Sequence, residues 1–341
     1  MRSTSTISVI LAMCVCLAAC SEPDLRSTPD QRPTSIIHGI SYPVWAEDGY
    51  SRVENAEHIT QIAATGANWI SFTITWYQPN TKASCPEPTI ETAHLDGLDR
   101  VTELAADAGL HVAIKAMVDV SDGTYRGELE PADLDRWFTC YGQLMAEIAD
   151  RAERSGAELI VVGTEFISLE QYDERWRSLI ADLRERFSGS LTYSVNFTDV
   201  GSVDFWDDLD LIGVSAYWPL SEVPTTDVDA LVEAWQPVAA LLDTMSLRWD
   251  RPILLAELGY RSVEGATTAP WDWATGSQPA DEEQEAAFAA AARVWQRRDT
   301  FGGVLIWAWD DLADTDEDQA TDYTPRGKPA ESIIRTWFST T

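Results

Sequence analysis

Two glutamates each stand at the end of a short apolar run, where a carboxyl group can act as an acid, a base or a nucleophile. Glu165 ends the run in LIVVGTEFIS, and Glu257 ends the run in PILLAELGYRS. If both runs are parallel strands of one closed sheet, their carboxyl ends open onto the same cavity and the two side chains face each other. The alternative for each glutamate is an ordinary acid beyond a strand, paired with a cation such as Lys115 or Arg261. The repeated arrangement favours a functional pair.

Two facing carboxyl groups are the apparatus of glycoside hydrolysis, in which one protonates the leaving oxygen and the other meets the anomeric carbon. In the retaining form they lie about 5 to 5.5 Å apart, and the nucleophile forms a glycosyl ester that water then cleaves. One group must carry a proton while the other is ionised, so their surroundings must differ. The pair therefore predicts a glycosidase that needs no cofactor.

The elements that must position this pair follow from the alternation of apolar and helical segments. Short β-branched runs are separated by stretches of helical periodicity, for example residues 131–156 and 281–299, which indicates βα units and a parallel sheet. The expected strands are residues 35–41, 68–75, 111–117, 158–164, 190–196, 209–215, 251–257 and 302–309. Eight units in about 300 residues predict a single α/β domain, a (β/α)8 TIM barrel. A doubly wound open sheet is the alternative, but no glycine-rich phosphate loop follows the first strand.

The N-terminal residues differ in composition from the rest of the chain. Residues 1–19 combine Arg2 with an apolar run of 13 residues, as in a signal peptide, and that run is too short to span a bilayer. The segment LAAC resembles the lipobox of bacterial lipoproteins, in which Cys20 becomes the lipid-bearing first residue. An uncleaved core segment is the alternative. We expect residues 20–35 to be a lipidated, disordered tether and residues 36–341 to be the barrel domain, exported and anchored at the outer membrane or cell surface.

Composition limits the partners. The formal net charge of −32 repels nucleic acid and anionic lipid headgroups, and it suits neutral or cationic substrates. The histidines fall singly and no Cys-x-x-Cys occurs, so we predict no metal site. An exported location permits a disulfide between Cys85 and Cys140, although two free buried thiols remain open. We expect a monomer.

Several motifs together resemble glycoside hydrolase family 113. They are VVGTEF, LIGVSAYWPL, LLAELGYRS, VLIWAWD and YTPRGKPAESIIRTWF, and the likeness spans roughly residues 36 to 338. The resemblance implies a retaining TIM-barrel enzyme of clan A. The members of family 113 are known chiefly as β-1,4-mannanases. It also implies that Glu165 is the acid/base and Glu257 the nucleophile. Many clan members have asparagine before the acid/base where this chain has Thr164, which leaves open which residue contacts the substrate's 2-hydroxyl.

Three further side chains are expected near the pair. Tyr217, in SAYWP, matches the clan tyrosine that hydrogen-bonds the nucleophile, although a packing role is the alternative. Asn196 and Lys115 lie near the cavity ends of expected strands and are candidates for binding sugar hydroxyls. Lys115 could instead pair with an acid.

The tryptophans number 15 and divide by position. Those in helical stretches are expected to pack in the core: Trp137, Trp176, Trp235, Trp295 and Trp337. Those at strand ends, or in the loops that follow, could stack on pyranose rings: Trp45, Trp76, Trp218, Trp271, Trp273, Trp307 and Trp309. Trp307 resembles the strand-eight tryptophan that floors the clan's central subsite.

The sequence thus predicts a retaining hydrolase of a β-linked polysaccharide or oligosaccharide, with β-1,4-mannan as the leading substrate. Another β-glycan such as glucan or xylan, or exo-acting release of single sugars, stays open because specificity lies in the loops. A glycan-binding surface lipoprotein without catalysis is the alternative of another class.

Overall fold

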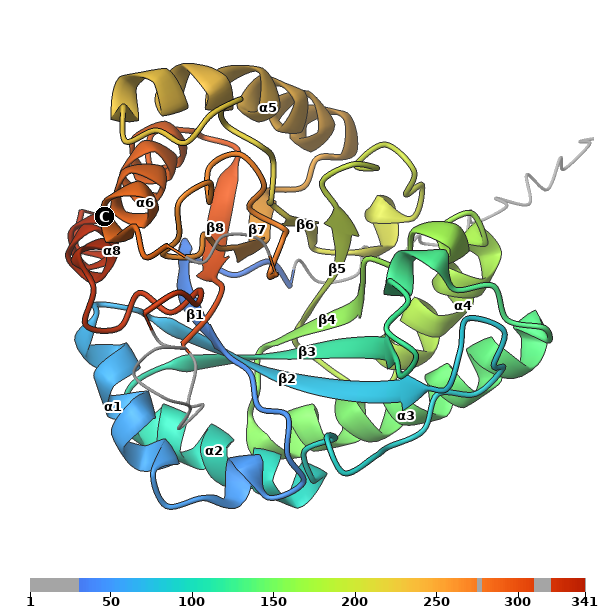
Figure 1. Ribbon diagram of the computed structural model, residues 1–341. Helices are drawn as coiled ribbons and strands as arrows, with labels where there is room; N and C mark the ends of the chain where they lie inside the picture. Colours follow the sequence, from blue (N-terminus) through green and yellow to red (C-terminus); the bar gives the residue numbers. More distant parts are fainter. Residues whose placement is uncertain (1–30, 275–277, 310–319, 341) are drawn as a thin grey trace, which may run out of the picture. The chain divides into compact units, whose positions relative to one another are not determined.

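Eight parallel strands close into a barrel in the order of the sequence, from β1 to β8 and back to β1, in a computed structural model that describes residues 31–274, 278–309 and 320–340 (Figure 1). The strands are β1 (Ile37–Tyr42), β2 (Trp69–Gln78), β3 (His111–Val120), β4 (Leu159–Thr164), β5 (Ser190–Asn196), β6 (Leu211–Ser215), β7 (Ile253–Leu258) and β8 (Phe301–Ile306). The predicted (β/α)8 barrel is confirmed. The predicted leader, with Cys20, lies outside the described residues, and the unit that contains the barrel begins at Gln31.

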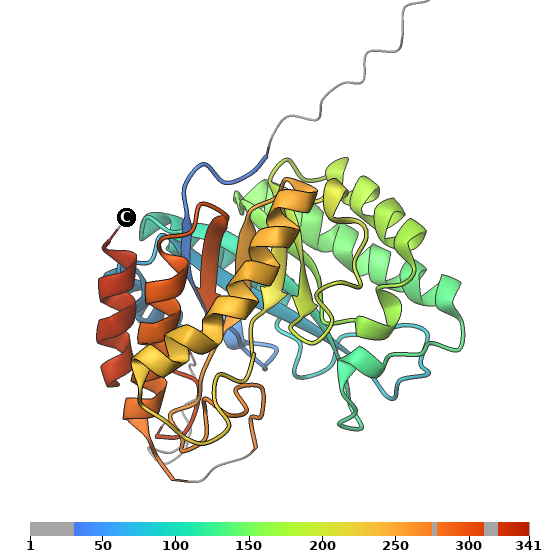
Figure 2. The same ribbon diagram turned by 90° about the horizontal axis from the view of Figure 1, so that it is seen from above.

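Helices surround the strands on the outside of the barrel (Figures 1 and 2). They are α1 (Asn55–Ala64), α2 (Leu95–Asp107), α3 (Leu134–Ser155), α4 (Asp173–Arg184), α5 (Val228–Trp249), α6 (Asp281–Trp295) and α8 (Pro329–Phe338). Short 3-10 turns are η1 (Gly49–Ser51), η2 (Arg126–Glu128), η3 (Ile167–Leu169) and η4 (Trp206–Asp208). In the described ranges, no helix is long and apolar enough to cross a membrane.

The long helix α3 shows how local sequence sets an element. The Asp133 side chain caps its start by accepting a hydrogen bond from the backbone N–H of Arg136 at 3.0 Å. Its end falls at Gly156, whose φ of 80° is the left-handed conformation that glycine adopts at low cost. Between these caps, Trp137 and Tyr141 are spaced four residues apart on the face that packs against the barrel.

Strand alternation divides the apolar residues between two cores. One lies inside the barrel and contains Ile37, Trp69, Ala113, Leu159, Leu211, Leu254, Ala256 and Leu305. The other lies between barrel and helices and takes the intervening residues, for example Ile70, Phe72 and Ile74 of β2. The five tryptophans of the helical stretches are buried in this outer core.

Two tryptophans predicted to bind sugar lie in the outer core instead, so those predictions are wrong. Trp76 shares the outward face of β2 with Ile74, is 3% exposed, and meets Tyr141 of α3 edge-on at 6.2 Å between ring centroids. Trp309 is 1% exposed in the same core, and its backbone N–H donates to the Ser41 carbonyl of β1. An aromatic residue near a strand end faces the cavity only if the alternation turns it inward.

Register shifts bring Glu257 to the inner face. Ala256 belongs to the inner core, so strict alternation would turn Glu257 outward and Leu258 inward. Instead Leu258 packs in the outer core, and the register shifts between Val214 and Ser215 opposite β7 and between Leu255 and Leu258 opposite β8. Such bulges re-aim side chains next to active sites.

A disulfide joins Cys85, in the connection after β2, to Cys140 of α3. It therefore ties a loop at the carboxyl end of the barrel to the helix that packs behind β3 and β4. The alternative, in which both cysteines are free buried thiols, is therefore wrong.

Candidate active site

The backbone at Glu165 is held in an unusual conformation by strand β5. Its φ is 59°, a left-handed value that is uncommon for residues other than glycine. Its N–H donates to the Ser194 carbonyl at 2.9 Å, and the next N–H, that of Phe166, donates to the Tyr193 hydroxyl at 2.8 Å. Strain of this kind persists where surrounding contacts over-determine it, and such sites cluster at functional positions.

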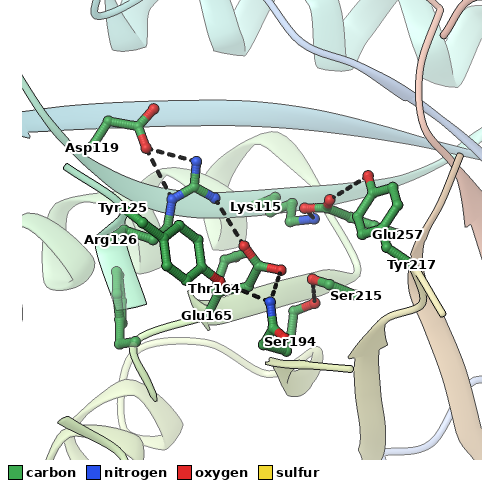
Figure 3. A network of polar contacts seen from close by, with 12 residues as sticks. Lys115, Asp119, Tyr125, Arg126, Thr164, Glu165, Ser194, Ser215, Tyr217 and Glu257 are labelled. Atoms are coloured by element: carbon green, nitrogen blue, oxygen red, sulfur yellow. Dashed lines mark hydrogen bonds and ion pairs between the residues drawn. The ribbon is translucent and has the colours of Figure 1, made fainter. Parts of the chain in front are cut away.

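Glu165 is a buried residue, 7% exposed, and its carboxylate has polar partners from two elements (Figure 3). Oε1 accepts a hydrogen bond from the Asn196 amide at 2.9 Å, and Oε2 lies 3.6 Å from the Arg126 guanidinium. Arg126 is in turn held by Asp119, to which its Nε donates at 2.9 Å. The same Asn196 amide also donates to the Tyr125 hydroxyl at 2.8 Å. Asn196 therefore orients Glu165, and its Nδ2 donates to two protein groups rather than standing open to a sugar.

The Glu257 carboxylate is held by a different set of groups. Oε1 forms an ion pair with Lys115, and Oε2 accepts a hydrogen bond from the Tyr217 hydroxyl at 2.7 Å (Figure 3). Lys115 is fully buried and also donates to the Ala256 carbonyl at 3.3 Å. Of its two predicted roles, the structure shows the pairing with an acid, because a side chain enclosed in this way is not presented to a sugar hydroxyl. A cation and a phenol that both donate are the partners of an ionised carboxylate.

Burial and charge give Glu165 the character of a proton carrier. Burial raises the pKa of Glu165, the neighbouring charge of Glu257 raises it further, and Arg126 and Lys115 oppose the rise without cancelling it. Burial also lowers the pKa of Lys115 against the attraction of Glu257. Because burial, followed by the Glu257 charge, raises the pKa of Tyr217, that hydroxyl keeps its proton and serves as a donor. Two carboxyls with contrasting neighbours are the arrangement that acid and nucleophile require.

Trp307 lies near the Lys115–Glu257 ion pair, and Trp45 lies against Trp307. Trp307 and Trp45 meet edge-on with ring centroids 6.4 Å apart, and both are half-buried. The Lys115 ammonium lies 5.3 Å from the Trp307 ring centroid. Trp307 therefore lies beside the cation that is paired with Glu257.

Thr164 ends β4, directly before Glu165. It is fully buried, and its hydroxyl donates to the Ala116 carbonyl of β3 at 3.1 Å. This hydrogen bond joins β4 to β3 directly before Glu165.

Three polar residues on the side of Glu165 were not predicted. Asp119, Tyr125 and Arg126 come from the end of β3 and the segment DGTYRGEL that follows it. The signal was present, because a tyrosine and an arginine stand just beyond a strand's carboxyl end, where barrel sites form. In the part of the chain that the structure describes, no group of three or more His, Cys, Asp or Glu is arranged to hold a metal ion.

Comparison with known proteins adds a family and a set of similar structures. The sequence profile of Glycoside Hydrolase Family 113 matches residues 40–328. A structure described as a complex of a GH113 β-1,4-mannanase has 25% identity and a TM-score of 0.79, covering 90% of this chain and all (100%) of that one. The GH113 β-mannanase AaManA from Alicyclobacillus acidocaldarius, in complex with ManMIm, has 26% identity and a TM-score of 0.82, covering 89% of this chain and 97% of that one. Among curated protein sequences, no match is found.

Proposed function

Because the chain belongs to glycoside hydrolase family 113, we propose that Glu165 and Glu257 cleave β-glycosidic bonds by double displacement, with retention of configuration. The observation that carries the proposal is the contrast between two buried carboxyls in one network. The pKa of Glu165 is raised by burial and by Glu257, while Glu257 receives hydrogen bonds from Lys115 and Tyr217. The first group is suited to give a proton and the second to attack carbon.

In the first step, a Glu257 oxygen attacks the anomeric carbon while the bond to the leaving oxygen breaks. Glu165 gives its proton to that oxygen, so the leaving sugar departs as a neutral alcohol and Glu165 becomes a carboxylate. Glu257 is then a glycosyl ester and no longer carries charge. The Glu257 charge that raised the pKa of Glu165 has gone, which prepares Glu165 to act as a base.

In the second step, Glu165 takes a proton from water while the water oxygen attacks the anomeric carbon. The ester bond breaks, its electron pair returns to Glu257, and the proton on Glu165 restores the starting state. Lys115 and Tyr217 stabilise the carboxylate that is released, because both donate to it. Arg126 holds Glu165 from the other side and stabilises its ionised form between the two steps.

Carboxyl-to-amide variants test the pair. Glu165→Gln and Glu257→Gln keep the side-chain shape and remove the acid, so both should lower turnover by orders of magnitude while oligosaccharide binding is retained. A fluoro-glycoside inactivator followed by peptide mass mapping should label the peptide that contains Glu257. Label on Glu165 would reverse the two roles, and full activity in either variant would refute the mechanism.

We further propose that the substrate is β-1,4-mannan or its oligosaccharides. The support is the likeness to two structures described as mannanases, at 25% and 26% identity. A neutral polymer also suits a chain of net charge −32, which would repel acidic glycans. Incubation with defined mannan, glucan and xylan oligosaccharides tests this. Faster cleavage of glucan or xylan than of mannan would contradict it.

We also propose that the mature protein is a monomer anchored to the bacterial cell envelope by lipid on Cys20. The Cys85–Cys140 disulfide supports export, since such bonds persist in oxidising compartments. Cys20→Ala should move the protein from the membrane fraction to the soluble fraction. Unchanged membrane association in that variant would contradict the anchor.

A further inference from the structure

A third buried carboxyl, that of Glu170, lies in the segment that follows Glu165. The residue is 1% exposed and comes directly after the short turn η3. Its Oε1 accepts a hydrogen bond from the Tyr193 hydroxyl at 2.9 Å, and its Oε2 is hydrogen-bonded to the Ser202 hydroxyl. Burying a carboxyl is costly unless its hydrogen bonds compensate, so a glutamate enclosed here points to a role for these two bonds.

The Tyr193 hydroxyl connects Glu170 to the backbone of Glu165. It gives its single hydrogen to Glu170 and accepts the N–H of Phe166, the residue after Glu165, at 2.8 Å. On the other side, the N–H of Glu165 itself donates to the Ser194 carbonyl. The peptide groups before and after the Glu165 Cα are therefore both tied to β5, which holds the uncommon φ of 59° between them.

The Ser202 hydroxyl connects Glu170 to the side-chain partner of Glu165. Ser202 Oγ lies 2.8 Å from the Asp199 carbonyl, to which it can donate, and the Asp199 N–H donates to the Asn196 carbonyl at 3.0 Å. Asn196 is the residue whose amide donates to Glu165 Oε1. The carboxyl of Glu170 thus reaches the segment that orients the Glu165 side chain as well as the tyrosine that holds its backbone.

A proton on Glu170 lets all of these groups form hydrogen bonds at once. Ser202 has one hydrogen but two acceptors beside it, Glu170 Oε2 and the Asp199 carbonyl. Protonated Glu170 donates to Ser202, which then donates to Asp199. Burial raises the pKa of Glu170 to about 7. The hydrogen bonds that it accepts oppose this rise, and the charges of Asp199 and Glu165 add to it.

We propose that Glu170 is a positioning residue for the acid/base Glu165. Through Tyr193 it fixes the backbone at Glu165, and through Ser202 it fixes the segment that begins at Asn196. This inference rests on the proposed function. A catalytic side chain keeps its productive geometry only when the groups behind it are themselves locked by hydrogen bonds and packing.

The consequence falls on proton transfer rather than on nucleophilic attack. Glu165 must reach the leaving oxygen within hydrogen-bond distance, and a displacement of about 1 Å can slow such a step about 100-fold. Glu257 is held by a separate set of groups, Lys115 and Tyr217, so its attack on the anomeric carbon should be little affected.

Two substrates separate proton donation from the rest of catalysis. Cleavage of mannopentaose releases a sugar alcohol, which needs the proton of Glu165, whereas dinitrophenyl β-mannoside releases a weakly basic phenolate that does not. For both substrates, kcat/KM reports the steps up to formation of the ester on Glu257. A mispositioned Glu165 therefore lowers kcat/KM for mannopentaose alone.

The variants remove the bridging groups one at a time. Tyr193→Phe, which keeps the ring, should lower kcat/KM for mannopentaose about 10-fold and for dinitrophenyl β-mannoside less than about 2-fold. Glu170→Leu should give the same split. Glu170→Gln can accept from Tyr193 and donate to Ser202 as the protonated carboxyl does, so both substrates should stay within about 2-fold of the full chain. Tyr141→Phe is the matched control, because that buried hydroxyl donates to the Val162 carbonyl of β4 at 2.8 Å and its loss should lower stability without the split.

Azide gives a second readout, because it attacks the glycosyl ester without a base. An azide nitrogen bonds to the anomeric carbon, the ester bond breaks, and its electron pair returns to Glu257. With dinitrophenyl β-mannoside, azide should therefore restore kcat in Tyr193→Phe and Glu170→Leu and yield mannosyl azide, since only the proton transfers of Glu165 are impaired.

The outcomes are separable. Equal losses on both substrates in Tyr193→Phe, no loss on mannopentaose, or no response of the impaired variants to azide would each overturn the positioning role. The same split in Tyr141→Phe, or a loss in Glu170→Gln as large as that in Glu170→Leu, would also overturn it. If Glu170→Leu does not fold, the comparison of Tyr193→Phe with Tyr141→Phe decides the question. If the full chain turned over neither substrate, the proposed function itself would fail and this inference with it.

Discussion

Arg126→Met should move the alkaline limb of the pH profile to higher pH. Glu165 must be protonated to act as the acid, so kcat/KM falls as pH rises through its pKa. The Arg126 guanidinium lies 3.6 Å from Glu165 Oε2 and favours the carboxylate, hence it lowers the pKa of Glu165. Without this cation the proton is held to higher pH. Methionine keeps the apolar stem and removes only the charge.

The magnitude follows from the same distance. Two unit charges 3.6 Å apart interact by about 5 kcal/mol at an effective dielectric constant of about 20, as an upper bound. Arg126 is shared with Asp119, which offsets part of its charge at Glu165. A neighbouring arginine commonly shifts a carboxyl pKa by about 1 to 3 units, and the shared charge favours the lower end. We therefore expect the limb to rise by about 1 pH unit.

The assay is kcat/KM against pH on mannopentaose, whose leaving group needs the proton. Asp119→Asn is the matched control of opposite sign. It removes an anion and leaves Arg126 unopposed, so the limb should move to lower pH. Arg126→Lys retains the charge and should shift the limb least. Glu257 and Lys115 also shift the pKa of Glu165, and both are unchanged in all three variants. An unchanged limb in Arg126→Met, or shifts of the same sign in Arg126→Met and Asp119→Asn, would refute the reasoning.

Three further predictions rest on other contacts. Lys115→Met should lower kcat at least about 100-fold, because Glu257 loses a buried cationic donor; steady-state kinetics measure this, with Lys82→Met as the exposed-lysine control. Replacing Cys85 and Cys140 together by serine should lower the free energy of unfolding by about 2 to 4 kcal/mol, since the bond closes a loop with a sequence separation of 55; denaturant titration checks this, and equal stability would contradict it. Burial raises the pKa of Glu170 to about 7, so the folded state loses stability as pH rises from about 4.5 to 7 while the unfolded chain ionises first. Glu170→Gln should remove roughly 3 kcal/mol of this pH dependence, and parallel stability curves for the two proteins would refute it.

The barrel could be predicted because each strand run is short, rich in apolar and β-branched residues, and bounded by helical periodicity, which are local properties of the sequence. The same locality explains the errors. Trp76 and Trp309 both stand near strand ends. Trp76 lies on the outward face of β2, and Trp309 packs in the outer core, where its backbone N–H donates to the Ser41 carbonyl of β1. The direction in which a side chain points beyond a strand end depends on bulges and turns. These are set by pairing between strands rather than by composition.

The two glutamates could be placed near each other from their positions at the ends of apolar runs, whereas the cations around them were only partly predicted. Lys115 could be placed near the cavity, but its choice between sugar and carboxylate depends on the three-dimensional approach of β3 to β7, which no local pattern encodes. Arg126 lies in a polar segment whose sequence is typical of a surface loop. Only the fold shows that its guanidinium lies 3.6 Å from Glu165 Oε2.

Strand β3 carries the side chains that give the two carboxyls different amounts of neighbouring positive charge. It pairs with β2 from His111 to Val120, but with β4 only over Ala113, Ile114 and Lys115, so its second half continues beyond β4 (Figure 1). Lys115 and Asp119 are four residues apart on one face of this strand, about 13 Å along it. Lys115 contacts Glu257 directly, whereas Asp119 reaches Glu165 only through Arg126.

The two carboxyls therefore receive unequal amounts of positive charge from one strand. Glu257 faces a whole ammonium group, and Glu165 faces a guanidinium that already shares its charge with an acid. This inequality is the physical basis for the proposed assignment of Glu257 as nucleophile and Glu165 as acid. It also predicts that Asp119→Asn, by freeing Arg126, makes Glu165 a weaker proton holder and reduces activity most at the alkaline end, where protonated Glu165 is scarcest.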